Sequence, residues 1–404
     1  AANTSGHQGA LMAPTEVLAE QHFLSISAQL QAEQLPGEPI DAVRHASLPG
    51  EGNRRITIVL LIGSLQGSIK NRIQQMIADG EADLIIGTHA LLQEQVAIPN
   101  LGLAVVDEQH RFGVEQRGAL TRCDPRPHLL AMSATPIPRT LSLTVYGDLD
   151  ITTLRVLPKG RKPITTSLAN TNPTENAAYE LIRRQVSEGR QAFVVCPLIE
   201  PSESIEAESA LEEFERLSEV EFKGLQVGLL HGRMKLAEKQ NVMDRVRNRN
   251  IDVLVATPVI EVGVDIPNAT VMMIMSANRF GLAQLHQLRG RVGRGEHESY
   301  CILKSSTKGE IANERLNALL NHSDGFKLAE EDLRIRGPGD YMGTRQSGWD
   351  ELKVATIDDV DLLQIARQEA SDLLADGTLD SINANQPLAK ELERATSSHF
   401  TEFS

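Results

Sequence analysis

Short apolar runs alternate along the chain with longer segments in which apolar residues recur every three or four positions. Runs such as Val59–Ile62 and Leu103–Val106 are apolar on both faces, which is typical of strands covered by helices on both sides of a sheet. We predict five strands in the first half, at Ala10–Ala13, Ile56–Ile62, Leu84–Thr88, Leu103–Asp107 and His128–Ser133. We predict six more in the second half, at Thr165–Ala169, Ala192–Leu198, Gln226–Leu230, Val253–Thr257, Val271–Met275 and Tyr300–Leu303.

Amphipathic segments of helical length lie between these strands. We predict helices at Glu16–Gln34, Ser68–Asp79, Pro136–Tyr146, Pro173–Glu188, Leu236–Arg247 and Gly281–Leu288. Since this strand–helix alternation occurs twice, it predicts an α/β fold with two tandem parallel-sheet domains. The boundary is expected between Asp148 and Pro163, where Leu-Pro-Lys-Gly-Arg-Lys-Pro is typical of a linker. We therefore assign residues 1–150 to the first domain, 151–305 to the second and 306–404 to a C-terminal part.

Composition places the chain among ordinary soluble proteins. Its 404 residues are 41% hydrophobic and 23% charged, and its apolar runs have the length of strands rather than of membrane spans. Three widely separated cysteines, Cys123, Cys196 and Cys301, indicate neither a disulfide framework nor a pair of metal ligands. A reducing, cytoplasmic setting is the simplest expectation.

The net charge of −14 at first argues against a nucleic-acid partner. However, the segment Glu200–Glu221 alone holds nine glutamates and one arginine, a net charge of −8, and is interpreted as a solvated loop and helix face. By contrast, Lys223–Arg249 holds seven basic residues against Glu238 and Asp244. A basic surface is therefore compatible with the acidic total, although 3% aromatic content disfavours a platform for stacking bases.

An arginine-rich segment, Arg279–Gly295, contains no acidic residue. Its arginines are Arg279, Arg289, Arg291 and Arg294, and Gly290, Gly293 and Gly295 lie between or beside them. Glycine would let another molecule approach the backbone, and arginine is well suited to phosphate oxygens. The spacing of Arg291 and Arg294 predicts that both lie on one side of a helical turn. A pair of arginines inserted at a phosphate is favoured over a solvated basic helix end, because this glycine punctuation is unusual in a surface helix.

Asp107 and Glu108 directly follow an apolar strand, and ligands of parallel sheets bind beyond the carboxyl ends of the strands. Two adjacent carboxylates there suit one hard cation and one base for water. The Asp-Glu dipeptide alone is common, but its place between the strand and Gln109-His110 makes it specific. Ser133-Ala134-Thr135 and His89 are weaker signals, since a helix cap and a polar loop residue explain them equally well.

Two loops in the second half remain open to two interpretations. Asp265 and Gly263 follow the strand Val253–Thr257; Asp265 could cap a helix, or it could contact a ribose or the opposing domain. The segment His231–Lys235 carries two basic residues after another strand and could bind a phosphodiester or be a solvated loop.

Seven ordered strings together resemble the motor of superfamily 2 helicases, in which two RecA-like domains bind ATP. They are APTEVLAEQH, IGTHALLQ, VVDEQHRFGVEQR, MSATPIPRTL, PLIEPSE, LLHGRM and FGLAQLHQLRGRVGRG. Their detail, together with DLRIRGPGDYMGTRQSG at Asp332–Gly348, is similar to the RecG family of bacterial ATP-dependent helicases. This resemblance spans Ala10 to about Lys353 and implies an ATP-hydrolysing motor that remodels stalled forks and four-way junctions in recombination and repair.

The resemblance also implies roles for single residues. In the nucleotide site, Asp107 would hold Mg²⁺ and Glu108 would activate water, with the remaining contacts at Gln109, His110, Arg291, Arg294, Gln287, Gly263 and Asp265. The residues implied in DNA contact or its coupling to hydrolysis are Thr15, His89, Ser133, Thr135, Arg139, Thr257, Arg334, Arg336, Arg345 and Gln346. A helical hairpin at Glu310–Leu320 and Phe326–Leu333 would lead into a glycine-rich translocation loop and then a helical tail.

ATP and Mg²⁺ are the cofactors that the resemblance implies. Its implied partners are branched double-stranded DNA and, as a second candidate, single-strand-binding protein. It further implies a monomer, no membrane association and a cytoplasmic location.

The chain departs from the family pattern at the phosphate-binding loop. No G-x-x-x-x-G-K-[ST] string is present, and Gly63–Ser68 is glycine-rich with the wrong spacing. We expect that the sequence starts just after this loop, that the family's wedge domain is missing, and that this chain hydrolyses little ATP. Two alternatives stay open: a transcription-repair coupling translocase, which shares the motor, and a catalytically silent DNA-binding module.

Overall fold

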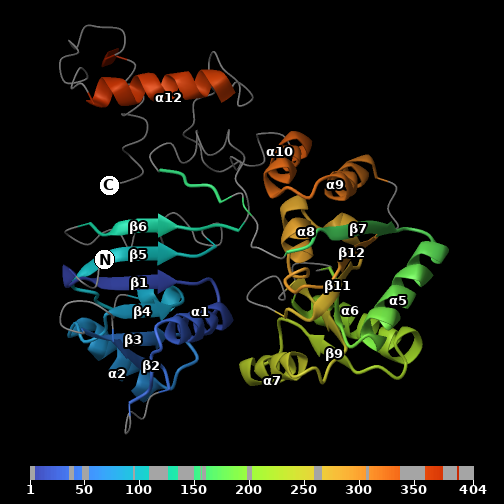
Figure 1. Ribbon diagram of the computed structural model, residues 1–404, viewed down its shortest axis with the longest axis horizontal. Helices are drawn as coiled ribbons and strands as arrows, with labels where there is room; N and C mark the ends of the chain where they lie inside the picture. Colours follow the sequence, from blue (N-terminus) through green and yellow to red (C-terminus); the bar gives the residue numbers. More distant parts are fainter. Residues whose placement is uncertain are drawn as a thin grey trace. The chain divides into compact units, whose positions relative to one another are not determined.

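The structure, a computed structural model, shows two compact units that we treat separately (Figure 1). It describes residues 5–35, 41–47, 54–93, 96–108, 126–134, 150–154, 156, 161–197, 203–258, 266–305, 309–336, 360–375 and 389–390. One unit is built mainly from Ala1–Ala134 and the other from Thr135–Thr257 and Ile266–Ser404. Each unit contains one sheet of predominantly parallel strands together with helices, which confirms the predicted α/β fold class. The linker predicted between Asp148 and Pro163 stays a prediction, because much of it lies outside the described residues.

The first unit holds a six-stranded sheet in the order β2-β3-β4-β1-β5-β6. Its strands are β1 (Gln8–Met12), β2 (Val43–Ser47), β3 (Arg55–Leu61), β4 (Leu84–Gly87), β5 (Leu101–Val106) and β6 (His128–Ala131). Only β2 runs antiparallel to its neighbour. The helices in the described part of this unit are α1 (Glu16–Gln29), α2 (Gly67–Ala78) and a 3₁₀ turn at His89–Leu92. Five strands of this sheet were predicted within a few residues of their observed bounds.

Strand β2 was missed, and the first helix was predicted five residues too long. The helix ends at Gln29, and Gln31 adopts a left-handed backbone with φ 51°. This turn lets the chain double back, so that Glu33 bridges to His45 on β2. Because β2 reads Val-Arg-His-Ala-Ser, it lacks the apolar run that predicted the other strands. Its place at the sheet edge tolerates this polarity.

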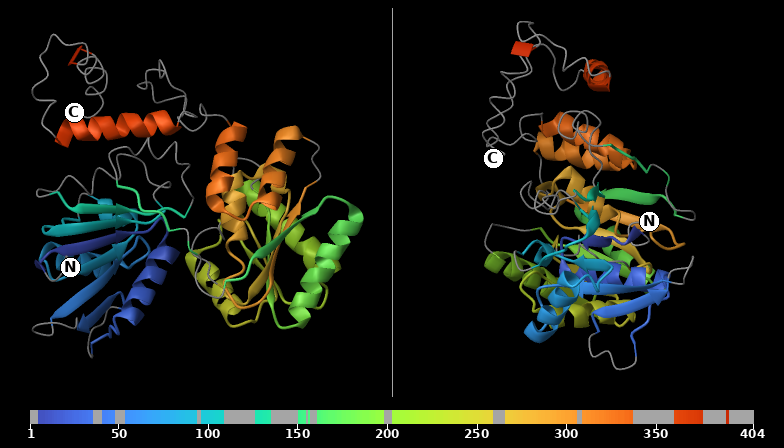
Figure 2. Two further views of the ribbon diagram at one scale, coloured as in Figure 1. Left: turned by 45° about the horizontal axis from the view of Figure 1, so that its top comes forward. Right: turned by 90° about the vertical axis from the view of Figure 1, so that its left-hand side faces the viewer.

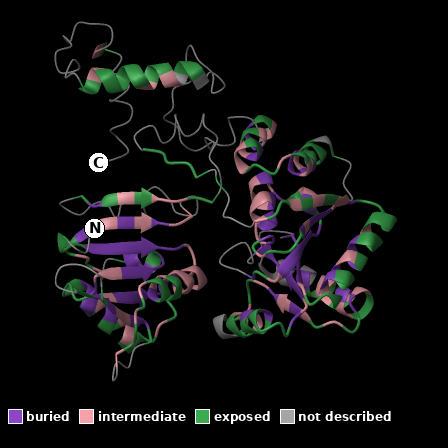
Figure 3. Ribbon diagram, viewed as in Figure 1, coloured by how far each residue is buried: buried purple, intermediate pink, exposed green. Residues whose placement is uncertain are grey.

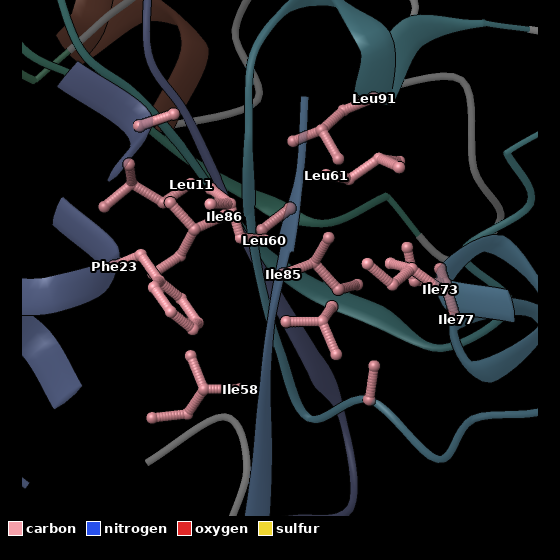
Figure 4. Close-up of a cluster of buried hydrophobic side chains, with 14 of the residues drawn as sticks. Leu11, Phe23, Ile58, Leu60, Leu61, Ile73, Ile77, Ile85, Ile86 and Leu91 are labelled. Carbon is pink, nitrogen blue, oxygen red and sulfur yellow. The ribbon is translucent and has the colours of Figure 1, made fainter. Parts of the chain in front are cut away.

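The core of the first unit lies on both faces of its sheet. Figure 4 shows Phe23 of α1 on one side and Ile73 and Ile77 of α2 on the other, with Ile85 and Ile86 of β4 between them. All five side chains are buried, which a strand apolar on both faces requires. At the outer edge, β6 differs: Leu130 is 50% exposed. The whole strand is exposed or intermediate (Figure 3).

The second unit holds an all-parallel sheet in the order β7-β12-β11-β8-β10-β9. Its strands are β7 (Ile164–Ala169), β8 (Gln191–Val195), β9 (Val227–Leu230), β10 (Val253–Ala256), β11 (Ala269–Ile274) and β12 (Ser299–Lys304). The helices are α5 (Asn172–Ser187), α6 (Glu203–Arg216), α7 (Leu236–Arg247), α8 (Leu282–Arg289), α9 (Glu310–Asn321) and α10 (Gly325–Arg336). A further helix, α12 (Val360–Ala375), agrees with the predicted helical tail. Helices α8, α9 and α10 pack against one another (Figures 1 and 2).

The acidic segment is more than a solvated face. Helix α6 continues into a π-helical turn at Leu217–Glu221, and Leu217 is fully buried. The Arg216 guanidinium binds Glu213 at 2.6 Å and Glu221 at 3.4 Å. Ion pairing within the segment therefore offsets part of its negative charge.

The two described cysteines, Cys196 and Cys301, are buried free thiols. Burial raises the pKa of Cys196 and of Cys301 to about 12, so both are protonated and unreactive at neutral pH. Cys123 lies outside the described residues.

The same glutamine clamp begins the central strand of each sheet. Gln8 is 4% exposed, and its Nε2 donates to Ile77 O at 3.1 Å and Ala82 O at 2.8 Å. Gln191 is 3% exposed, and its Nε2 donates to Val246 O at 2.8 Å and Ile251 O at 2.7 Å. In both units, one acceptor is a carbonyl in the last turn of a helix, at Ile77 or Val246. The other is the carbonyl of the residue two positions before the next strand, at Ala82 or Ile251. The clamp thus holds a helix and two strands at the amino edge of each sheet.

We expect Gln191→Leu to destabilise the second unit by about 1 to 3 kcal/mol, since it removes the Gln191 donor from the carbonyl of Ile251, whereas Val246 O keeps its bond from Arg249 N. Thermal unfolding followed by circular dichroism would measure the loss. Gln226→Leu is the control, because Gln226 is exposed and bonds through its backbone. Equal melting temperatures for wild type and Gln191→Leu would contradict the clamp.

Candidate functional site

The ends of four strands meet at the carboxyl edge of the first sheet (Figure 1). Backbone bonds continue past the strands there, with Ala13 N to Gly87 O at 2.8 Å, Asp107 N to Met12 O at 2.9 Å and Met132 N to Val106 O at 2.8 Å. Because these bonds fix the register, the residues that follow each strand share one edge. They include the predicted Thr15, His89, Asp107, Glu108 and Ser133.

Asp107 and Glu108 are held in place by backbone donors. Asp107 Oδ1 accepts from Glu108 N at 2.9 Å, and Glu108 Oε2 accepts from Ala134 N at 3.4 Å. Glu108 has a left-handed φ of 51°, which is costly for a residue with a side chain and is often found at functional sites. Ser276 has φ 46° at the matching place after β11, so both units make this turn but only the first places a carboxylate there.

The donor set at this edge fits Mg²⁺. Both carboxylates are half-buried and offer oxygen ligands, which suit a hard cation. Within the part of the chain that the structure describes, no group of three or more His, Cys, Asp or Glu side chains could hold a metal. Mg²⁺ usually binds one or two carboxylates and completes its shell with phosphate oxygens and water, so two carboxylates are enough.

Other residues at this edge support the turn between β1 and α1. The Thr15 side chain caps α1 by accepting from Leu18 N at 3.4 Å. Glu16 Oε1 accepts from Ser64 N at 3.0 Å, which ties the glycine-rich Gly63–Ser68 stretch to α1. That stretch connects β3 to α2. His89 is exposed, and the neighbouring Thr88 is fully buried.

Several predicted residues lie outside the described residues. These are Gln109, His110, Thr135, Arg139, Gly263, Asp265, Arg345 and Gln346, together with the side chain of Arg336. Their assigned roles stay predictions. Thr257 is described and is 3% exposed. Its side chain could contact DNA only after a local rearrangement.

The arginine-rich segment of the second unit departs from its predicted geometry. Helix α8 ends at Arg289, and the chain continues through a turn in which Arg291 N bonds to Leu288 O at 3.0 Å. The prediction that Arg291 and Arg294 share one side of a helical turn is therefore wrong. Arg294 Nε donates back to Gly290 O at 3.3 Å, and Gln287 is half-buried on α8.

Two glycines of this segment serve the packing of the chain itself. Gly293 has φ 73°, and a Cβ there would lie 2.9 Å from Ile164 Cγ1. A Cβ on Gly295 would lie 2.6 Å from Pro267 O. The expectation that these glycines open the backbone to another molecule is wrong at both positions, because neighbouring residues already occupy the space.

Arg289 has a role that sequence reasoning missed. It is 4% exposed and donates to the carbonyls of Leu319 and His322, both at 2.9 Å, and of Ser323 at 3.2 Å. Those carbonyls end α9, so Arg289 joins α8 to the helical hairpin. A signal was present: Arg289 continues the apolar face of Leu282 and Leu285, and an arginine on such a face needs buried acceptors.

His286 supports this arginine as a neutral acceptor. Its Nδ1 accepts from Arg289 Nη2 at 2.9 Å. Burial, followed by the positive charge of Arg289, lowers the pKa of His286 to about 4. The imidazole is therefore uncharged at neutral pH and can accept this bond.

The predicted helical hairpin is confirmed by α9 and α10. Arg334 lies exposed near the end of α10, where it pairs with Glu331 at 2.9 Å and Glu314 at 3.8 Å. In the sequence, Arg334 lies shortly before the segment assigned to the translocation loop. None of the described helices is long and apolar enough to cross a membrane.

Comparison with known proteins identifies the class. The sequence profile of the DEAD/DEAH box helicases matches residues 1–144, and that of the helicase conserved C-terminal domain matches residues 174–296. The structure of Mss116p bound to single-stranded RNA and AMP-PNP, at 17% identity, shares the fold with a TM-score of 0.55 over 83% of this chain and 68% of that one. Fold and site define the chain as a superfamily 2 helicase motor with two RecA-like domains.

Within that class the chain belongs to the RecG family. The profile of ATP-dependent DNA helicase RecG, domain 3, C-terminal, matches residues 322–396. ATP-dependent DNA helicase RecG of Synechocystis is 46% identical over 93% of this chain and 43% of its own length, and that of Bacillus subtilis is 43% identical over 93% and 52%. The structure of RecG bound to a three-way DNA junction matches with 42% identity and a TM-score of 0.63, over 89% of this chain and 44% of that one. The chain spans about half the length of these relatives.

We expect the stability of the second unit to fall as pH drops from about 6.5 to about 4. Since the pKa of His286 is lowered on folding, the unfolded chain binds the proton first in this window. The His286 contribution is complete above pH 6.5 and is lost by pH 4, at most about 3 kcal/mol at about 1.4 kcal/mol per pKa unit.

Unfolding midpoints of wild type and His286→Asn, measured across this range, would show the effect, since asparagine keeps an acceptor but does not titrate. His297→Asn is the control, because His297 is exposed. Parallel pH profiles for wild type and His286→Asn would contradict the expectation.

Proposed function

We propose that this chain is the motor portion of an ATP-dependent DNA helicase or translocase that remodels branched DNA in recombination and repair. Membership of the RecG family supports the activity, and the RecG structure on a three-way junction supports stalled forks and four-way junctions as substrates. The match to the RecG domain 3 profile favours this function over a transcription-repair coupling translocase. A cytoplasmic location, a monomeric state and contact with single-strand-binding protein belong to the same proposal.

The observation that carries this proposal is the Asp107–Glu108 pair at the end of β5. Bound Mg²⁺ would neutralise phosphate charge and orient ATP at this edge. Asp107 is the carboxylate suited to hold it. Glu108, fixed by its left-handed backbone and by Ala134 N, would orient the attacking water and accept its proton.

The bond from Ala134 N to Glu108 also suggests how hydrolysis reaches DNA. Ala134 follows Ser133, one of the residues assigned to coupling. Hydrolysis of a nucleotide next to Glu108 would shift the backbone at Ser133 and Ala134. The ends of β5 and β6 would move together, because Met132 N is bonded to Val106 O. Thr15 and His89, at the same edge, are proposed as DNA contacts.

Different arginines of the segment Arg279–Gly295 are proposed to act on ATP and on the helical hairpin that contacts DNA. Arg291 and Arg294 are proposed to stabilise charge on the γ-phosphate during hydrolysis, with Gln287 nearby on α8. Arg289 instead grips the end of α9. A displacement of α8 would therefore carry the hairpin and Arg334 with it, and Arg334, Arg336 and Arg345 would act on duplex DNA.

We expect this chain to turn over ATP at less than about 0.1 s⁻¹ with three-way junction DNA, against about 1–10³ s⁻¹ for typical enzymes. The reason is that no G-x-x-x-x-G-K-[ST] loop is present to cradle the phosphates. A coupled phosphate-release assay would measure the rate, and Glu108→Gln should abolish what remains. Fast turnover that Glu108→Gln abolishes would show that these residues hold a complete phosphate site after all.

We expect the chain to bind a three-way junction at about 50 mM salt, with affinity that falls as salt rises. Arg334→Ala should weaken binding regardless of sequence and reduce the salt slope by about one, as for the loss of one phosphate contact. Fluorescence anisotropy of labelled junction and linear duplex would measure both quantities. Arg72→Ala is the control: Arg72 is exposed on α2 and has no assigned DNA contact, so this substitution should leave the slope unchanged.

Absence of binding to both DNAs at low salt would count against the motor function. An unchanged slope for Arg334→Ala would remove Arg334 alone from the DNA contacts.

A further inference from the structure

His22 contacts the carboxylate at the centre of the candidate site. It lies on α1, and its Nε2 is 2.8 Å from Asp107 Oδ2. The two side chains are 28% and 20% exposed, so the contact is partly shielded from water. The next residue along the helix, Phe23, is 3% exposed and packs into the core (Figure 4). Packing of Phe23 fixes α1 against the sheet and thereby fixes the position from which His22 reaches Asp107.

Both oxygens of Asp107 have a defined neighbour. Oδ1 accepts from Glu108 N at 2.9 Å, and Oδ2 faces His22. The backbone of Asp107 is itself held by Met12 O at 2.9 Å. A carboxylate with one donor on each oxygen is restricted in its rotation, so its free lone pairs point in set directions.

The other contacts of α1 at this edge show that the helix organises the site. Thr15 caps the helix, and Glu16 receives Ser64 N. His22 lies beyond these first-turn residues and reaches Asp107 at the end of β5. Thus one helix contacts both the β3–α2 connection and the end of β5.

Hydrogen bonds to a ligating carboxylate tune metal binding. Groups that orient a metal ligand from behind affect its affinity about 10- to 100-fold when they are removed. A carboxylate that binds Mg²⁺ alongside phosphates and water has few protein ligands to hold it, so its orientation matters more. Nothing in the motif assignments gave His22 a role, although it is the last residue of the APTEVLAEQH string.

We propose that His22 is a positioning residue, which donates its Nε2–H to Asp107 Oδ2 and holds that carboxylate in the orientation that binds the divalent cation. This inference rests on the proposed function of Asp107. It requires the tautomer, or the charged form, in which Nε2 carries hydrogen, since a bare Nε2 would repel the carboxylate.

The first test reads the hydrogen bond without any variant or metal. Nitrogen-15 NMR of the wild-type chain, with His22 assigned from the loss of its signals in His22→Gln, reports which ring nitrogen is protonated. We expect hydrogen on Nε2. A neutral ring protonated only on Nδ1 would overturn the positioning role while leaving the proposed function of Asp107 intact.

The second test reads the metal with Mn²⁺ as a probe for Mg²⁺. Paramagnetic broadening of the backbone signals of residues 106–108 measures Mn²⁺ binding at this edge of the sheet. Mn²⁺ bound at distant sites does not broaden these signals. We expect His22→Leu, which removes the donor at similar bulk, to weaken Mn²⁺ binding about tenfold. His22→Gln, which keeps an N–H donor near the Nε2 position, should stay within about threefold of wild type, and His128→Leu, an exposed histidine on β6, should match wild type.

Each result decides the question. Equal Mn²⁺ binding by wild type and a folded His22→Leu chain overturns the positioning role. An equal loss of Mn²⁺ affinity in His22→Gln and His22→Leu also overturns the positioning role, because the imidazole would then act through packing rather than as a hydrogen-bond donor. Failure of Mn²⁺ to broaden residues 106–108 in wild type, with Nε2 protonated, overturns the metal role of Asp107 and with it this inference.

Discussion

The backbone ladder between β1, β5 and β6 is the constraint on which the site depends. Main-chain bonds from Asp107 to Met12 and from Met132 to Val106 set where each strand ends. The functional side chains extend from this rigid edge, where the Ala134 amide and a left-handed backbone help to hold the Glu108 carboxylate. The buried clamp of Gln8 secures the opposite edge, so helix ends and strand starts there are held by the same central strand.

The second unit repeats this backbone with different chemistry. Gln191 makes the clamp that Gln8 makes, and Ser276 makes the left-handed turn that Glu108 makes. Met275 and Ser276 follow β11 where Asp107 and Glu108 follow β5, so the second unit carries no carboxylate at that turn. Positive charge is concentrated one element later, after α8. The two units can therefore share one backbone arrangement and carry different functional side chains, because the fold tolerates any side chain that the turn geometry permits.

Arginine performs two different tasks within six residues of that segment. Arg289 is buried and donates to carbonyls at the end of α9; burial lowers its pKa, and these hydrogen bonds offset the loss of hydration. Arg294 is exposed and bonds the turn after α8. The neutral His286 completes the buried arrangement, since a charged imidazole beside Arg289 would oppose it.

The sequence by itself determined the alternation of strands and helices, the two parallel sheets and the place of Asp107 and Glu108, because apolar runs and strand ends are local patterns that burial enforces. It also placed the end of α8 within one residue, but it could not show β2, which is a polar edge strand, or the non-helical turn that follows α8 at Arg291. Only the tertiary structure decided that Arg289 grips α9, that His22 faces Asp107 and that Gly293 and Gly295 serve internal packing. Those contacts join residues as far apart in the sequence as Ile164 and Gly293, and no local pattern specifies which distant residue a side chain or a glycine will meet.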